Sequence, residues 1–234
     1  QNAKFAFCYL LASLNRDIIV NEFGFFPMLN LFGFKGSGKT ELGESLLHFF
    51  GPEQKGINLP NSTEPAIADY ISQSRNALAL LDEYKSNFEP SKIEFLKGLW
   101  KAIGRSRMNM DKDKKKETTR VDTGIIICGQ EMPTADIALF SRLIYLTFYK
   151  TEYSDQEKKF FNELKEIEKQ GLTHLTHEIL SQRAYFKKNY LDAYNKCADD
   201  LRDALKDVVI EDRIFRNWLV ALASFYTLRD KINT

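Results

Sequence analysis

The octapeptide from Gly33 to Thr40 constrains the fold of this chain more than any other stretch. It reads Gly-Phe-Lys-Gly-Ser-Gly-Lys-Thr and matches the phosphate-binding pattern G-x-x-x-x-G-K-[ST] in full. The apolar run Met28 to Phe32 before it predicts a buried strand, and residues Glu41 to Phe50 after it predict a helix. Because such a loop binds phosphate where a strand meets a helix N-terminus, this context favours a nucleotide site over a glycine-rich turn that binds nothing.

Each residue type in the octapeptide has a task in holding a nucleotide. The three glycines let the backbone bend so that successive N–H groups point at the phosphates. Lys39 supplies a positive charge to the β- and γ-phosphates, and the Thr40 hydroxyl is placed to bind Mg²⁺. The residues expected to contact ATP are Gly33, Lys35, Gly36, Ser37, Gly38, Lys39, Thr40 and Glu41.

A second apolar run, Ala77 to Leu81, predicts a strand that ends in two acids, Asp82 and Glu83. Nucleotide hydrolysis needs such a pair, one carboxylate for the water shell of Mg²⁺ and one to orient and polarise the attacking water. We assign Asp82, with Thr40, to the metal and Glu83 to the water. The alternative is a solvated acidic turn after a buried strand, which the phosphate loop some forty residues earlier disfavours.

The third apolar strand is predicted at Gly124 to Cys128, and Gln130 follows it. If that strand lies between the phosphate loop and the acidic pair, Gln130 can contact the γ-phosphate or the attacking water. Arg142 stands between a short predicted helix, Thr134 to Ser141, and the last predicted strand, Leu143 to Phe148. An arginine at that junction can reach the γ-phosphate bound to a neighbouring subunit. The alternative is that Arg142 caps the C-terminus of its own helix.

The one concentrated positive element runs from Arg105 to Lys116, with six basic residues against two acidic ones and no apolar periodicity. Clustered Lys and Arg side chains produce sequence-independent, salt-sensitive binding to DNA phosphates. The alternative of a solvated loop stays open. The candidate DNA contacts are Arg105, Arg107, Lys112, Lys114, Lys115 and Lys116.

The alternation of apolar strands and helices predicts an α/β fold, a three-layer phosphate-loop core with a mainly parallel sheet. We place this core at residues 1–152 and an all-helical C-terminal region at residues 153–234. A helix is expected to begin at Pro90 and end near Gly104, with Trp100 in the core. Ser154 to Glu157 reads as a capping box, and one apolar face follows it, formed by Phe160, Phe161, Leu164 and Ile167.

Composition narrows the class of protein further. A net charge of +1 excludes a uniformly basic nucleic-acid binder, although it permits a local basic element. Three widely spaced cysteines indicate neither a disulfide framework nor a zinc site, so the cytoplasm is the expected location. The apolar run Phe5 to Leu14 is about half the length of a membrane span and predicts a buried helix. A chain that begins at Gln1 without methionine is interpreted as part of a longer protein.

Four segments together resemble the ATPase modules of primase-helicase proteins from phages and integrated mobile elements: Gly33 to Thr40, Leu80 to Glu83, Ile126 to Glu131, and Phe140 to Arg142. These modules are similar to superfamily III helicases and, more distantly, to AAA+ ATPases. The resemblance covers about residues 28–148. It implies ATP at Lys39 and Thr40, Mg²⁺ at Asp82, water activation at Glu83, sensing at Gln130 and an Arg142 that acts in trans. The sensor of such ATPases is commonly Asn, whereas Gln130 is a longer amide.

The resemblance also implies a hexameric ring in which the basic segment faces a channel for single-stranded DNA. The first hypothesis is therefore an ATP-driven motor on DNA, the helicase part of a mobile-element replication protein. The second is an ATP-dependent switch or loader that assembles with a protein partner. A nucleotide-binding scaffold without catalysis is disfavoured because Glu83 would have no task there.

Overall fold

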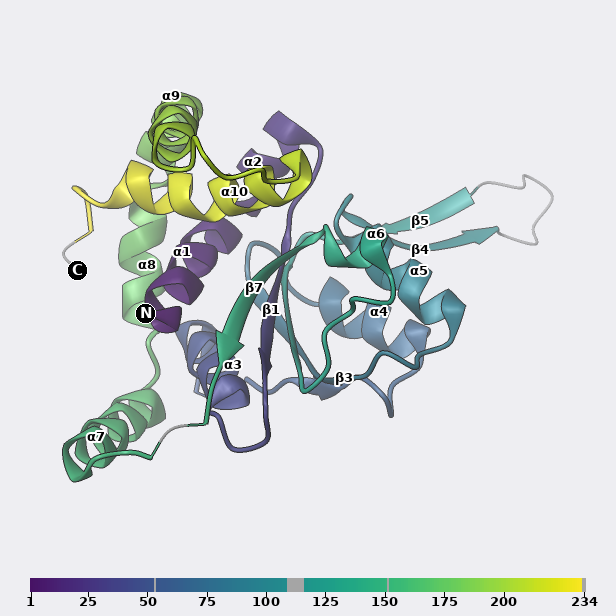
Figure 1. The fold of residues 1–234 in the computed structure, drawn as a ribbon, viewed down its shortest axis with the longest axis horizontal. Helices are drawn as coiled ribbons and strands as arrows, with labels where there is room; N and C mark the ends of the chain where they lie inside the picture. Colours follow the sequence, from purple (N-terminus) through teal and green to yellow (C-terminus); the bar gives the residue numbers. More distant parts are fainter. Residues whose placement is uncertain (53, 109–115, 151, 233–234) are drawn as a thin grey trace.

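The computed structural model describes residues 1–52, 54–108, 116–150 and 152–232, and for residues 103–108 and 116–120 it describes the backbone alone. Its centre is a five-stranded, all-parallel sheet with the strand order β2-β3-β6-β1-β7 (Figure 1). The strands are β1 (Met28–Gly33), β2 (Ile57–Asn58), β3 (Leu78–Tyr84), β6 (Gly124–Gly129) and β7 (Leu143–Phe148). The predicted α/β class with a mainly parallel sheet is confirmed.

The strands are apolar on both faces because helices cover the sheet from both sides, as a parallel sheet requires. Successive side chains of a strand point to opposite faces. Accordingly, Leu29 and Leu31 belong to one core cluster, and Met28 belongs to the other. The first cluster includes residues of α1 (Asn2–Leu14), α2 (Arg16–Phe23), α3 (Lys39–Leu47), α8 (Thr173–Ser181), α9 (Arg183–Ala204) and α10 (Asp212–Leu228). The second includes residues of α4 (Glu64–Ser72), α5 (Pro90–Leu99) and α6 (Ile137–Phe140).

The strand order decides which loops meet. β6 pairs with β1 on one side and with β3 on the other, so the predicted place of this strand between the phosphate loop and the acidic pair is correct. Because all five strands are parallel, the segments that follow β1, β3 and β6 emerge at the same edge of the sheet. β7 lies on the other side of β1, where Gly33 pairs with Phe148.

The region after α5 differs from the prediction. The helix ends at Leu99 rather than near Gly104, and Ile103 begins β4 (Ile103–Met108). β4 pairs antiparallel with β5 (Lys116–Arg120), and Figure 1 shows both strands extending away from the main sheet. The ends of the basic segment are therefore strands of a two-stranded sheet rather than an irregular loop. Alternating Arg and Ser side chains gave no apolar signal from which this pairing could be predicted.

Smaller differences concern helix ends. The predicted helix from Thr134 to Ser141 is shorter and forms α6 alone, with Asp136 as its N-cap. The helix after the phosphate loop is α3, which ends at Leu47 and continues as the 3-10 turn η1 (His48–Phe50). Trp100 is half-buried, stacks on Phe25 with a ring-centroid distance of 4.6 Å, and donates a hydrogen bond to Asn217, so it is a packing residue as predicted.

The C-terminal region is helical in the part of it that the structure describes. α7 (Asp155–Gln170) begins with the predicted capping box of Ser154 and Glu157. Figure 1 shows α7 apart from the other C-terminal helices, and its apolar side chains are exposed, with Phe160 at 56% and Ile167 at 51%. α10 packs on α1, at the start of the chain. The division at residues 152 and 153 stays a prediction. None of the helices in the described ranges has the length and apolarity that crossing a membrane requires.

Candidate nucleotide site

The segment between β1 and α3 has the backbone geometry of a phosphate cradle. Gly36 and Gly38 have φ angles of 77° and 83°, a left-handed conformation that glycine adopts without strain. Gly38 is the N-cap of α3, and no side chain of the described residues caps this helix. A side-chain cap is also lacking at α1, α2, α5, α8, α9 and α10, so the left-handed glycines before α3 are what distinguish its N-terminus. The first N–H groups of α3 are thus left for an anion.

Gly33 is needed for a different reason from the one predicted. It belongs to β1 and is not among the glycines with positive φ, so it does not bend the loop. A Cβ atom at this position would lie 2.5 Å from the Phe148 carbonyl oxygen and 2.9 Å from Ser37 Oγ. The close approach of β7 to the start of the loop therefore excludes a side chain here.

Lys39 is 8% exposed, and its ammonium group donates a hydrogen bond of 3.3 Å to the Phe34 carbonyl oxygen. This bond folds the Lys39 side chain back over the loop. Lys35 is exposed beside it. Glu41, in the first turn of α3, has its carboxylate paired with Lys165 of α7, which also forms an ion pair of 2.7 Å with Glu168.

The tip of β3 brings the acidic pair beside the loop. Thr40 Oγ1 lies 3.5 Å from Asp82 Oδ1, although the two residues are 42 positions apart in the sequence. In a regular strand, Asp82 and Glu83 would point to opposite faces of the sheet. Glu83 instead has a φ of 63°, and the register with β6 shifts between Leu81 and Tyr84. This bulge turns both carboxylates toward one cleft, and the left-handed residue costs about 1 to 2 kcal/mol.

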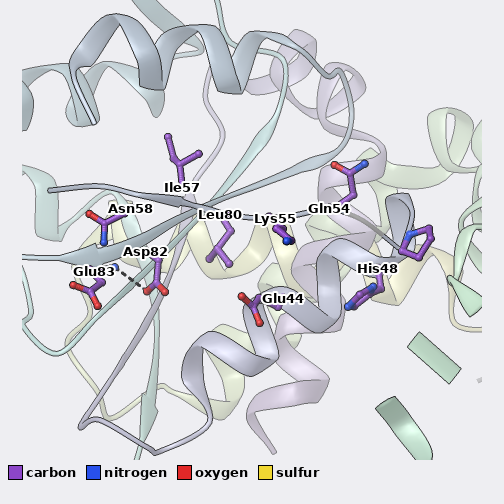
Figure 2. Close-up of a pocket in the computed structure, with 11 residues that line it drawn as sticks. Glu44, His48, Gln54, Lys55, Ile57, Asn58, Leu80, Asp82 and Glu83 are labelled. Carbon is purple, nitrogen blue, oxygen red and sulfur yellow. Dashed lines mark hydrogen bonds between the residues drawn. The ribbon is translucent and has the colours of Figure 1, made fainter. Parts of the chain in front are cut away.

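Asp82 also stabilises this conformation, because its Oδ1 accepts a hydrogen bond of 2.7 Å from the Glu83 backbone N–H (Figure 2). The cleft between the phosphate loop and the tips of β3 and β6 has a volume of about 280 Å³. Its lining includes Lys35, Gly36, Lys39, Thr40, Asp82, Glu83 and Gln130. The fold thus brings these predicted residues together at one cleft, whereas Gly33, Ser37, Gly38 and Glu41 are not among its lining residues.

Three further cleft residues were not predicted. Lys85 and Glu131 line the same cleft. Ser86 donates two hydrogen bonds to the Glu131 carboxylate, from its hydroxyl and from its backbone N–H (2.7 Å), and these bonds lower the pKa of Glu131. Glu44 faces Asp82 from α3 in the adjoining cleft, of about 380 Å³ (Figure 2). Burial raises the pKa of Glu44, and the nearby carboxylates of Glu41 and Asp82 raise it further. Glu44 could have been predicted from the sequence, because it lies one helical turn after Thr40 and so on the same face of the helix.

Arg142 lies at the N-terminal end of the parallel strands, whereas the phosphate loop lies at their C-terminal end. It precedes Leu143, which pairs with Met28 at the start of β1, whereas the loop follows the end of β1. Its guanidinium donates a hydrogen bond to the Ala138 carbonyl oxygen and lies 5.6 Å from the centre of the Trp100 ring. Burial lowers the pKa of Arg142, and the neighbouring Arg213 lowers it further. Arg142 therefore contacts the end of its own α6 and is remote from the nucleotide cleft of its own chain.

The other candidates lie outside this cleft. Lys112, Lys114 and Lys115 are outside the described residues, whereas Arg105 and Arg107 are on β4 and Lys116 begins β5. Among the C-terminal arginines, Arg183 pairs with Asp17 at 2.5 Å, and Arg213 donates a hydrogen bond of 2.6 Å to Ser141. Arg216 lies over the Phe25 ring. These contacts tie the C-terminal helices to the core.

The donor set at the cleft fits Mg²⁺. A threonine hydroxyl and an aspartate carboxylate are hard oxygen ligands, the kind that Mg²⁺ prefers. The residues that the structure describes contain no group of three or more His, Cys, Asp or Glu side chains that could hold a metal by themselves. An Mg²⁺ ion bound with a nucleotide takes its remaining ligands from water and phosphate oxygens. His174 and His177 are exposed, and the three cysteines are free and buried.

Comparison with solved structures shows the same fold in a helicase. The structure described as "SCCmec type IV Cch - active helicase" has a TM-score of 0.72 to this chain at 16% sequence identity. The match covers 98% of this chain and 43% of the helicase chain, so this chain spans less than half of that protein. No family model matches this chain, and no curated protein sequence matches it. At this identity, the likeness establishes the fold.

Proposed function

We propose that this chain is an ATP-hydrolysing motor module that acts on DNA, the helicase part of a mobile-element or phage replication protein. In this proposal ATP binds across the phosphate loop with Mg²⁺ held at Thr40 and Asp82. Glu83 accepts a proton from the attacking water, and Gln130 contacts the γ-phosphate or that water. The observation that carries the nucleotide part is the 3.5 Å approach of Thr40 Oγ1 to Asp82 Oδ1 beside an uncapped helix N-terminus.

The DNA part of the proposal rests on separate observations. Arg105 and Arg107 belong to β4 and Lys116 begins β5, and these two paired strands extend from the main sheet (Figure 1). The solved structure with the same fold is described as an active helicase. We propose that the hairpin contacts single-stranded DNA in the channel of a hexameric ring in the cytoplasm.

The first test is the steady-state ATPase rate with and without single-stranded DNA, with Lys39→Ala protein as the blank. We expect DNA to raise the rate several-fold at low salt, and we expect the stimulation to weaken at moderate salt because phosphate contacts are screened. A robust ATPase rate that is indifferent to DNA would instead favour the switch or loader. ATP turnover by Lys39→Ala equal to that of the unchanged protein would contradict the site assignment itself.

The second test concerns the basic hairpin. Replacing Lys112, Lys114, Lys115 and Lys116 with Gln should flatten the dependence of DNA affinity on salt. If all four contact phosphates of a single strand, the slope of log K against log salt should fall by about 3. The measurement is a fluorescence-anisotropy titration with a labelled oligonucleotide at several salt concentrations.

The matched control removes four exposed lysines elsewhere, Lys187, Lys188, Lys196 and Lys206 of α9 and the segment after it. Its net charge equals that of the hairpin variant, so general electrostatic attraction changes equally in both. An equal loss of slope in the two variants would place the DNA site outside the hairpin.

A further inference from the structure

The strand order separates the two ends of a nucleotide bound as proposed above. The groups for Mg²⁺ and the γ-phosphate are at the tips of β3 and β6, on one side of β1. β7 is on the other side of β1 and ends level with the phosphate loop, because Gly33 pairs with Phe148. A triphosphate whose γ end lies toward Asp82 and Glu83 directs its nucleoside toward the tip of β7.

Two exposed tyrosines stand at that tip. Tyr149 directly follows β7 and is 73% exposed, and Tyr153, four residues later, is 49% exposed. The Tyr153 phenolic oxygen lies 3.6 Å from the position that a Cβ atom on Gly38 would occupy. Its side chain therefore already reaches the N-terminus of α3.

The next segment of the chain is tied to the same helix. Tyr153 directly precedes the capping box of α7, and Lys165 of α7 pairs with Glu41 in the first turn of α3. Lys165 also pairs with Glu168, whose side chain is almost fully buried, and Glu168 lies 3.7 Å from His48 just after α3. These contacts anchor the C-terminal half of α7 to both ends of α3.

We propose that Tyr153, with Tyr149, forms the platform on which the purine base of the bound nucleotide stacks. This inference rests on the proposed nucleotide site and adds the residues that contact the base. A tyrosine ring with one face open to solvent gains from stacking, and a purine offers a larger face than a pyrimidine. In this arrangement the phosphate loop binds the triphosphate, and the two tyrosines bind the base and so favour a nucleotide over a bare polyphosphate.

The test compares two ligands that differ only in the nucleoside, Mg²⁺–ATP and Mg²⁺–tripolyphosphate, by equilibrium titration. Tyr153→Ala should weaken ATP binding about tenfold, equivalent to about 1.4 kcal/mol, and should leave tripolyphosphate binding unchanged. Tyr153→Phe should bind both ligands as the unchanged protein does, because it keeps the ring. Tyr185→Ala, which removes a partly exposed tyrosine of α9, is the matched control.

Equal weakening for both ligands, or no change for ATP, would overturn the platform. Failure of the unchanged protein to bind either ligand would refute the proposed nucleotide site and the platform with it. Photolabelling of the unchanged protein with 8-azido-ATP tests the same contact without any substitution. The label is expected on the tryptic peptides that contain Tyr149 and Tyr153, and label confined to other peptides would overturn the inference.

Discussion

Glu83→Gln protein is expected to bind ATP with unchanged affinity and to hydrolyse it roughly 10²- to 10⁴-fold more slowly. The amide keeps the size of the side chain and leaves the backbone hydrogen bond to Asp82 in place. It cannot accept the proton of the attacking water, so only the chemical step is lost. The measurement pairs an ATP titration with a single-turnover hydrolysis assay.

The control for this substitution is Glu178→Gln on α8, which makes the same chemical change at an exposed position that does not line the cleft. It should leave the rate unchanged. Undiminished turnover by Glu83→Gln would show that Glu83 is not the base. The next candidates would then be Glu44 and Glu131, the other carboxylates beside Asp82 and Gln130.

Arg142→Ala protein is expected to lose roughly 10³- to 10⁵-fold in ATPase rate if the arginine completes the site of a neighbouring subunit. Its own nucleotide cleft is at the other edge of the sheet, so a large loss has to be transmitted between subunits. The competing role is the hydrogen bond to Ala138 at the end of α6, whose loss would lower stability by a few tenths of a kcal/mol and barely change the rate.

Mixing the two inactive proteins separates these roles. In a ring, a site with an intact Glu83 can receive an intact Arg142 from a Glu83→Gln neighbour, and an equal mixture contains about one quarter of such interfaces. We therefore expect ATPase activity to return on mixing Arg142→Ala with Glu83→Gln at a concentration that supports assembly. Thermal unfolding of Arg142→Ala protein alone measures how much stability is lost with the hydrogen bond to Ala138. Absence of rescue at high concentration, with both proteins folded, would favour the capping role.

Much of the fold follows from local sequence signals. The runs that form β1, β3, β6 and β7 are apolar enough to be buried on both faces, and Ser154 and Thr63 mark helix starts through their side-chain caps. The phosphate loop, the acids at a strand tip and Gln130 could be predicted because their chemistry depends on residue type and on short spacing in the sequence. A strand was predicted at Thr118 to Asp122, where β5 lies, but β4 and its pairing with β5 were missed because polar strands that extend from the main sheet carry no apolar periodicity.

Other features depend on contacts between distant segments. The sequence determined that a phosphate loop, an acidic pair and a sensor candidate each follow an apolar strand. Only the tertiary structure decided that Glu83 adopts a left-handed conformation, that Gly33 is required by Phe148, and that Glu44 faces Asp82. It also placed Arg142 at the far edge of the sheet and Tyr153 beside Gly38. Residue type fixes the chemistry of a side chain, whereas strand order and packing fix what that side chain can reach.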